Sequence, residues 1–239
     1  MTDRWSVHID IEGFGTLYDK EDGVLLALGD LMEGIYEIGR NFCPETPDRI
    51  FAHQIGDGFI VVSEFGADSL DIPASMAIAL LRHVTRRQRF AKATIAEGGF
   101  AGIEGCYPKT IREARDKDGR IFMGGGLMTT FPVMGTALIN AINVAKRSPS
   151  GSLLTLDVEN DKRLPKEFIR REIPDKNLLA IDWVHSDAAS IGEIQSAAKL
   201  FRPNPEALKV LFDQYFRSQN LPLSWRKNTN DYLSLTIGD

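Results

Sequence analysis

The stretch RIFAHQIGDGFIVVSEF, residues 49–65, constrains the fold of this chain more than any other part of the sequence. It contains two short apolar runs separated by Gly56-Asp57-Gly58, and an Asp-Gly pair between apolar runs is typical of a tight β-hairpin. The pattern predicts two adjacent antiparallel strands, about 49–54 and 58–64. A turn does not by itself require an acid between two buried runs, so Asp57 is also a candidate for binding a ligand.

The hairpin lies at the centre of an alternating series of elements. Residues 4–11, RWSVHIDI, alternate as a strand does, and apolar positions from Gly23 follow helical spacing until Cys43-Pro44. After the hairpin, residues 73–90 read as a second helix and residues 91–102 as a strand. The order β-α-β-β-α-β predicts the α+β class, with a ferredoxin-like layer built on an antiparallel-rich sheet.

The sequence after residue 102 also predicts helices and strands. We expect a charged connection or short helix over 107–119, extended chain interrupted by three glycines over 120–133, a helix over 136–147 and a strand over 152–158. Farther on, the sequence predicts a strand over 178–184 and helices over about 188–201 and 205–219, the second with Asn204 as N-cap and Pro205 in its first turn. We therefore expect a catalytic core over residues 1–157 and an α-rich extension over 158–239 that packs on the core or on a partner chain.

Composition narrows the possible partners. The formal net charge of -5 argues against a broad nucleic-acid or anionic-membrane surface. There is no signal-peptide pattern and no apolar run approaching the roughly 18 residues that span a bilayer, so we expect a cytoplasmic protein with two reduced cysteines. The basic cluster of Arg82, Arg86, Arg87 and Arg89 is interpreted as a solvated helix face and not a phosphate site.

Two acidic residues should meet at one rim of the sheet. Asp10 ends the first strand and Asp57 lies in the hairpin turn, so both carboxylates come together if these elements are neighbours. Like charges in contact repel unless a cation lies between them, and a pair of hard oxygen ligands suits Mg²⁺ or Mn²⁺ together with phosphate oxygens. The alternative is that Asp10 caps a turn and Asp57 only favours a tight one.

The residues around both acids resemble a known family. The segment DIEGFG, residues 10–15, is similar to the first metal motif of class III nucleotidyl cyclases, and QIGDGFIVV, residues 54–62, is similar to their second. ATIAEGGFAG resembles the next strand of that family, and VMGTALINAINVAKR resembles its catalytic helix. The resemblance covers roughly residues 5–157.

The resemblance implies a two-metal site within a head-to-tail homodimer. Asp10 and Asp57, assisted by the Ile11 carbonyl, would bind two Mn²⁺ or Mg²⁺ ions, and Gly13 and Phe14 would lie against the sugar and triphosphate. In this family the ribose 3′-hydroxyl attacks the α-phosphate and expels pyrophosphate. The active sites lie at the dimer interface and use residues of both protomers.

The catalytic helix of the family carries Asn-x-Ala-x-Arg, in which asparagine orients the ribose and arginine stabilises phosphate charge. Asn143-Val144-Ala145-Lys146-Arg147 matches this pattern. The distance from Gly135 is about one helical turn longer than in the family, so Asn140 is a rival for the ribose role. Arg147 also has an ordinary explanation, as a basic residue in the last turn of a helix.

The base-reading position departs from the family. Adenylate-type members carry lysine and guanylate-type members glutamate four residues before the second aspartate, where this chain has His53. The chain is most similar to the pyrimidine cyclases of bacterial Pycsar anti-phage systems, above all to uridylate cyclases, whose cyclic UMP acts on a separate effector protein. The alternatives are a purine cyclase with an unusual base pocket, a histidine that is merely satisfied within a strand, or a catalytically silent cyclase-like regulatory domain.

Overall fold

The computed structural model describes residues 2–12, 21–44, 50–63 and 68–235. The helices are α1 (Glu21–Phe42), α2 (Asp71–Val84), α3 (Lys109–Ala114), α4 (Thr136–Arg147), α5 (Ala189–Ala197), α6 (Pro205–Ser218) and α7 (Leu223–Tyr232). The strands are β1 (Thr2–Ile11), β2 (Ile50–Ile55), β3 (Gly58–Ser63), β4 (Ala91–Gly102), β5 (Arg120–Met123), β6 (Gly126–Thr129), β7 (Val133–Met134), β8 (Leu154–Asp157), β9 (Arg170–Ile173) and β10 (Leu178–Ile181).

The main sheet begins with the predicted ferredoxin-like unit. Its order is β2-β3-β1-β4-β8-β10-β9, and each neighbouring pair from β2 to β4 is antiparallel. β8 then adds in parallel to β4, and β10 and β9 add in antiparallel fashion. The α+β class and the ferredoxin-like arrangement predicted from the sequence are confirmed.

The sheet does not end at residue 157, where the sequence suggested the limit of the core. β9 and β10 belong to the same sheet, and β10 pairs with β8 from Leu178 opposite Asp157 to Ile181 opposite Leu154. The extension therefore contributes strands as well as helices. Its predicted strand and two helices are present as β10, α5 and α6, and the Asn204 side chain caps α6 by accepting a hydrogen bond from the Ala207 amide.

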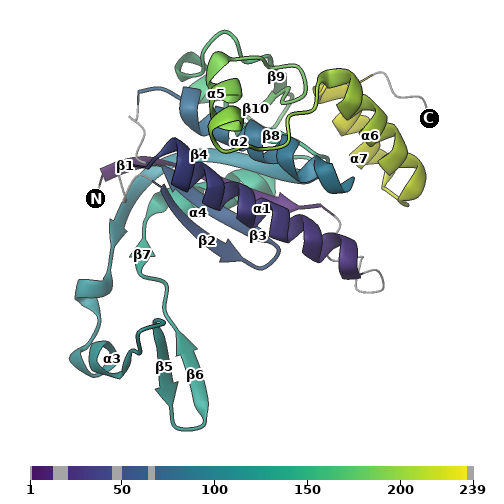
Figure 1. Cartoon of the computed structure of the whole chain (residues 1–239). Coiled ribbons are helices and arrows are strands. Elements are labelled where there is room, and N and C mark those ends of the chain that lie inside the picture. The colour runs from purple at the N-terminus through teal and green to yellow at the C-terminus, as the bar shows by residue number, and fades with distance from the viewer. Residues whose placement is uncertain (1, 13–20, 45–49, 64–67, 236–239) are drawn as a thin grey trace.

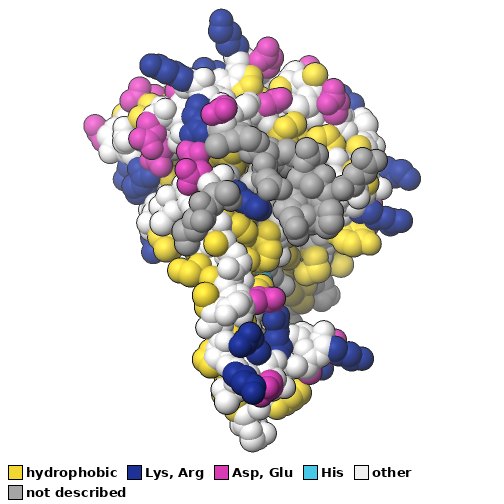
Figure 2. Space-filling view, turned by 90° about the vertical axis from the view of Figure 1, so that its left-hand side faces the viewer, with side chains coloured by type: hydrophobic (Ala, Val, Ile, Leu, Met, Phe, Trp, Pro, Cys, Tyr) yellow, Lys and Arg dark blue, Asp and Glu magenta, His cyan; other side chains and the backbone are white. Residues whose placement is uncertain are grey.

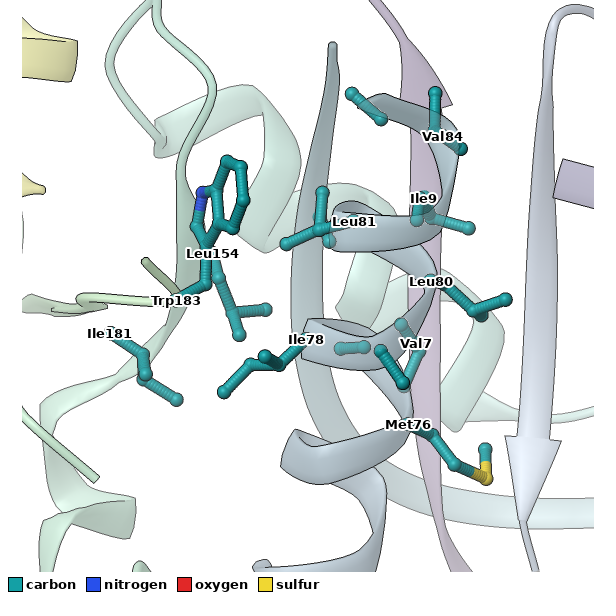
Figure 3. Close-up of a cluster of buried hydrophobic side chains, with 14 of the residues drawn as sticks. Val7, Ile9, Met76, Ile78, Leu80, Leu81, Val84, Leu154, Ile181 and Trp183 are labelled. Atoms are coloured by element: carbon teal, nitrogen blue, oxygen red, sulfur yellow. The ribbon is translucent and has the colours of Figure 1, made fainter. Parts of the chain in front are cut away.

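Helices cover both faces of the sheet (Figure 1). α1 and α2 lie on one face, where alternate residues of β1 such as Val7 and Ile9 are fully buried. Figure 3 shows α2 side chains interlocking with those of β1, β8 and β10. Every residue of α2 from Pro73 to Val84 is buried, which fits a helix that is apolar around most of its circumference.

α4 covers the opposite face, and two glycines allow it to approach closely. A Cβ on Gly98 of β4 would lie 2.4 Å from the Ala137 nitrogen, and one on Gly135 would lie 1.9 Å from the Gly99 carbonyl oxygen. The glycines in EGGFAG thus place the first turn of α4 directly on β4. α4 then runs back along the strand, so its last residues lie near Lys92.

An arm projects from the body between β4 and β7 (Figure 1). It contains α3 and the β5-β6 hairpin, the expected short helix and glycine-interrupted extended segment. Apolar side chains at its tip face solvent: Phe122, Met123 and Leu127 are 61%, 55% and 54% exposed. In Figure 2 the arm forms a separate lower lobe on which Lys and Arg side chains lie beside hydrophobic ones.

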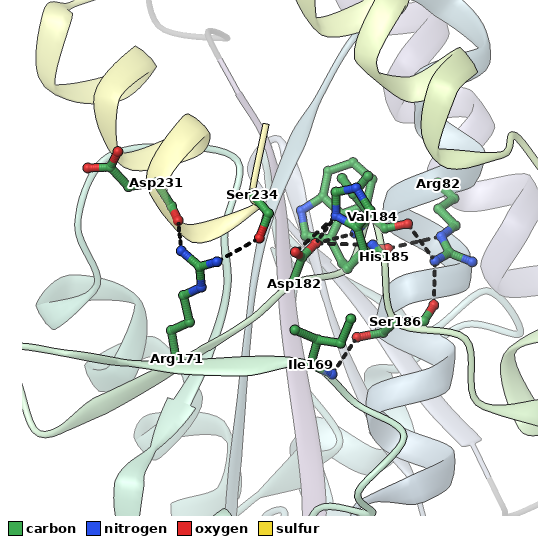
Figure 4. Close-up of polar contacts among 10 residues, drawn as sticks. Arg82, Ile169, Arg171, Asp182, Val184, His185, Ser186, Asp231 and Ser234 are labelled. Atoms are coloured by element: carbon green, nitrogen blue, oxygen red, sulfur yellow. Dashed lines mark hydrogen bonds and ion pairs between the residues drawn. The ribbon is translucent and has the colours of Figure 1, made fainter. Parts of the chain in front are cut away.

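The basic cluster at the end of α2 is solvated only in part, because Arg86 and Arg87 are exposed but Arg82 is buried. Arg82 is 7% exposed and donates hydrogen bonds to the carbonyls of Trp183 (3.0 Å), Val184 (3.1 Å) and Ser186 (2.7 Å), as Figure 4 shows in part. Arg86 and Arg87 both pair with Asp30 on α1. These arginines tie the helices to each other and to the segment after β10, because buried carbonyl and carboxylate groups need donors.

Within the described residues no helix is both long and apolar enough to cross a membrane.

Candidate functional site

Asp10 and Asp57 lie together at one rim of the sheet, as the sequence predicted. Asp10 is opposite Gly58 on β3, and Asp57 lies in the turn just before Gly58. The side chains of the two aspartates are in hydrogen-bonding contact. A Cβ on Gly58 would lie 2.5 Å from the Ile9 carbonyl oxygen and 2.8 Å from Asp10 Oδ1, so only glycine allows this approach.

The contact changes the acidity of Asp10. Burial, followed by the charge and hydrogen bond of Asp57 and the charge of Glu12, raises the pKa of Asp10 from 3.8 to about 7, against the opposing effect of Lys92. Two carboxylates in this arrangement share a proton or require a cation. The structure therefore supports a ligand-binding role for Asp57 beyond that of a turn residue.

Three further titratable residues adjoin the pair, and the sequence reading had not selected them. Lys92 lies opposite Asp10 on β4, and its Nζ donates to the carbonyls of Ser148 (3.2 Å) and Pro149 (2.8 Å). Burial lowers the pKa of Lys92 and of His8 and raises that of Glu12. The signal that could have identified Lys92 is the antiparallel pairing of β1 with β4, which places Lys92 beside Asp10.

The pair fits a hard divalent cation. It offers carboxylate oxygens only, which suit Mg²⁺ or Mn²⁺, and a bound cation would favour the ionised form that burial and Asp57 disfavour at Asp10. Within the described residues, no group of three or more His, Cys, Asp and Glu side chains is arranged to hold a metal.

Three other residues are predicted near the metal: Ile11, Gly13 and Phe14. The Ile11 amide donates to the Asp57 carbonyl at 3.4 Å, which places the end of β1 against the turn, and its carbonyl remains a predicted ligand. Gly13 and Phe14 lie outside the described residues.

The predicted catalytic residues of α4 gather in a separate polar pocket of about 310 Å³. Asn140, Asn143 and Arg147 all line it. Asn140 donates to the Glu97 carbonyl at 2.8 Å, and Arg147 pairs with Asp157 at 2.5 Å. Asn143 is exposed and is available to a ligand, whereas Arg147 must leave Asp157 to reach one.

This pocket is separate from the aspartate pair within one chain. Ala96 and Glu97 of β4 line the pocket, whereas Lys92 of the same strand lies opposite Asp10. Four residues of a strand span about 13 Å, which separates Ala96 and Glu97 from the aspartates, although the chain just after α4 approaches Lys92. Asp10 and Asp57 lie together, and they do not line the pocket that Asn140, Asn143 and Arg147 line.

His53 lies on β2 with its ring against Phe131, the two ring centroids being 4.1 Å apart. Phe131 belongs to the chain that returns from the arm, and Phe51 packs against it from the same side of β2 at 5.8 Å. Burial lowers the pKa of His53, so the imidazole is neutral at physiological pH. An uncharged imidazole can both donate and accept a hydrogen bond.

No protein-family model and no curated protein matches this chain. Among solved structures it is similar to two structures of a bacterial light-regulated adenylyl cyclase, at 12% and 10% identity with TM-scores of 0.47 and 0.46, over 84% and 82% of this chain. It is also similar to a guanylyl cyclase, at 11% identity and a TM-score of 0.41, over 75% of this chain and 90% of the other. The chain spans only 57% and 55% of the two light-regulated cyclase chains.

Proposed function

We propose that this protein is a metal-dependent nucleotidyl cyclase that converts a pyrimidine nucleoside triphosphate, with UTP favoured over CTP, to the 3′,5′-cyclic nucleotide and pyrophosphate. The observation that carries the proposal is the contact between Asp10 and Asp57 at the end of β1 and the β2-β3 turn. Two carboxylates in contact and partly buried are costly in a protein that does not use them, because one acid must hold a proton or both must hold a cation.

Asp10 and Asp57 would hold two Mn²⁺ or Mg²⁺ ions, with the Ile11 carbonyl assisting. When bound, such ions neutralise the triphosphate and favour ionisation of the ribose 3′-hydroxyl. The 3′-oxygen forms a bond to the α-phosphorus while the bond to the pyrophosphate oxygen breaks, and the hydroxyl proton passes to solvent. The protein orients these groups: Gly13 and Phe14 are assigned to the sugar and triphosphate, and Lys92 lies close enough to Asp10 and Glu12 to offset part of their charge.

The catalytic unit would be a homodimer with active sites at its interface. Asn143 and Arg147 line a pocket that Asp10 and Asp57 do not line, so we assign their catalytic roles to a second copy. The exposed apolar tip of the arm, formed by Phe122, Met123 and Leu127, is a suitable surface for that copy. Asn143 would orient the ribose, with Asn140 as its rival, and Arg147 would stabilise charge on the phosphate after leaving Asp157.

The pyrimidine assignment rests on His53. The position carries neither the lysine nor the glutamate of purine cyclases, and the neutral imidazole packed against Phe131 offers polar nitrogens without a formal charge. In this proposal cyclic UMP acts as a second messenger in a cytoplasmic anti-phage response of the Pycsar type, through a separate effector that senses the cyclic nucleotide. No nucleic acid or membrane takes part in the reaction.

Two other functions compete with this one. A purine cyclase with an unusual base pocket would use the same aspartate pair. A catalytically silent domain would not need that pair, and the tight approach that Gly58 permits favours an active enzyme over it.

The test is to incubate the purified protein with each of ATP, GTP, CTP and UTP and Mn²⁺, and to identify the products by mass spectrometry. Cyclic UMP as the main product supports the proposal. Cyclic AMP or cyclic GMP as the main product would reject the pyrimidine assignment, and absence of any cyclic product at every nucleotide would favour the silent domain.

A further inference from the structure

A hydrogen bond joins the C-terminal helices to the neighbourhood of the aspartate pair. The indole nitrogen of Trp225 donates to Oε2 of Glu12 at 2.9 Å. Trp225 lies in the first turn of α7 and is 4% exposed, and Glu12 follows directly after β1, two residues beyond Asp10. Residues from opposite ends of the sequence therefore meet beside the candidate metal site.

Glu12 lies two residues beyond Asp10, just after the end of β1. Its amide donates to the Phe90 carbonyl at 2.9 Å, which continues the ladder in which Ile11 faces Ala91. Residues two apart in a strand point to the same face, at a spacing of about 6.6 Å. The Glu12 charge also acts on Asp10. A glutamate side chain at this position is long enough to approach the aspartate pair if nothing holds it elsewhere.

The Glu12 carboxylate is nevertheless not grouped with the aspartates. In the part of the chain that the structure describes, no three acidic or imidazole side chains form a metal-binding set. The carboxylate is bonded to Trp225, whose ring packs 5.8 Å from that of Tyr215 on α6. The Glu12 side chain is thus turned toward the C-terminal helices.

α7 cannot readily follow a movement of Glu12, because other contacts fix it. Asn228 donates to the Ser150 carbonyl at 2.8 Å, and the Ser152 amide donates to Thr229 Oγ1 at 3.2 Å. The same loop also binds Lys92, because the carbonyls of Ser148 and Pro149 accept hydrogen bonds from its ammonium group. Trp225 is therefore a fixed donor, and the position of Glu12 depends on it.

We propose that Trp225 is a positioning residue that holds the Glu12 carboxylate away from Asp10 and Asp57, so that the site offers a divalent cation two carboxylates and not three. The inference rests on the proposed function in one respect, that the aspartate pair binds a divalent cation. Magnesium sites that act on nucleotides use one or two carboxylates together with substrate phosphates. A third carboxylate would bind the cation more tightly and compete with the triphosphate for it.

The test measures Mn²⁺ binding to the nucleotide-free protein by calorimetry, independently of activity. Trp225→Phe keeps the buried ring and removes the donor, so we expect its Kd for Mn²⁺ to fall about five- to tenfold as Glu12 gains access to the site. The double variant Trp225→Phe with Glu12→Gln should return to within about twofold of Glu12→Gln alone. The KM for the nucleotide should rise in Trp225→Phe and recover in the double variant.

Trp183→Phe is the matched control. Trp183 is also fully buried and donates its indole N–H at 2.8 Å, but to the Ser152 carbonyl and not to a carboxylate. It should lower the melting temperature and leave the Kd for Mn²⁺ unchanged. A change in Kd of the same size in both tryptophan variants would mean that general loosening is the cause and would overturn the proposal.

Two further outcomes would also overturn it. One is a folded Trp225→Phe variant whose Mn²⁺ affinity is unchanged or weaker. The other, which does not depend on that variant folding, is a loss of about tenfold or more in the Mn²⁺ affinity of Glu12→Gln alone, because that is the typical cost of losing a metal ligand. We expect Glu12→Gln to change the Kd by less than about threefold. Equal Mn²⁺ binding by the wild type and Asp57→Asn would instead show that the proposed metal site itself is wrong.

Discussion

The carboxyl groups of Asp10 and Asp57 are in hydrogen-bonding contact across the β1-β3 edge of the sheet. The contact forms because β1 and β3 are antiparallel neighbours and because Gly58 leaves space for Asp10 against the turn. Burial and the neighbouring charge then raise the pKa of Asp10 to about 7. A divalent cation bound there would replace the proton and remove the repulsion.

This pKa makes stability depend on pH when no divalent cation is present. The folded pKa of Asp10, about 7, is above its ordinary value of 3.8, so the stability it contributes is complete below pH 3.8 and is lost as pH rises through 7. The Asp10→Asn side chain cannot ionise, so this variant does not lose stability in that pH range. At pH 8 in EDTA we expect the variant to be about 1–2 kcal/mol more stable than the wild type by urea denaturation, after allowance for solvent screening.

The difference should disappear near pH 4, where the wild-type carboxyl is protonated as well. Asp213→Asn on the outer face of α6 is the control, because Asp213 pairs only with the exposed Arg217 in the described contacts. An Asp10→Asn variant that is less stable than the wild type at pH 8 in EDTA would contradict the raised pKa.

Gly58→Ala should separate the two aspartates. The added methyl would lie 2.5 Å from the Ile9 carbonyl oxygen, so β3 must shift away from β1 at the turn. We expect a loss of about 1–3 kcal/mol in the free energy of unfolding and a weakening of Mn²⁺ binding, both measurable on the purified variant. Gly29→Ala on α1, where the methyl meets no atom within 4 Å, should retain Mn²⁺ binding. Full Mn²⁺ affinity in Gly58→Ala would show that the close approach is not needed.

Arg82→Leu should destabilise the fold without altering the aspartate pair. The guanidinium satisfies the carbonyls of Trp183, Val184 and Ser186, and burial lowers its pKa to about 10. Removing it leaves buried acceptors unsatisfied, so we expect a loss of about 2–4 kcal/mol in chemical denaturation. Arg217 is an exposed residue of α6, so Arg217→Leu should change the free energy of unfolding by less than about 0.5 kcal/mol. Equal effects of the two substitutions would contradict the structural role of Arg82.

His53→Lys tests the base-reading position. A lysine places a charge beside Phe131, where the imidazole is neutral. We expect kcat/KM for UTP to fall at least about tenfold, whereas the uncharged His53→Gln should retain more of it. Unchanged nucleotide preference in both variants, measured by competition among the four triphosphates, would remove His53 from base recognition.

Local patterns in the sequence were sufficient for the elements that surround the candidate site. The Asp-Gly turn between apolar runs predicted the β2-β3 hairpin, and Pro44 marked the end of α1. α2 was expected to continue to residue 90, but it ends at Val84 and gives way to a 3₁₀ turn over Thr85–Arg87. Gln88, with a φ of 55°, ends this turn in the left-handed region. No glycine or proline in the sequence marks the end of the helix.

Contacts between distant segments could not be predicted in this way. Charge alone suggested that Arg82 was solvated, because its carbonyl partners come from the chain after β10. The same limit applies to the bond from Trp225 to Glu12 and to the addition of β9 and β10 to the sheet. α7 was not expected at all, since its sequence LSWRKNTNDY has a weak apolar pattern and is held by contacts with the loop at Ser150.

The central claim is that the aspartate pair supports cyclisation of a nucleoside triphosphate. The most direct measurement follows cyclic nucleotide and pyrophosphate together, from UTP and Mn²⁺, with the wild type, Asp57→Asn and the control Asp213→Asn. The account predicts equimolar cyclic UMP and pyrophosphate from the wild type and the control, and a fall of at least about a thousandfold in Asp57→Asn with the fold retained. Undiminished cyclic UMP formation by Asp57→Asn would contradict it.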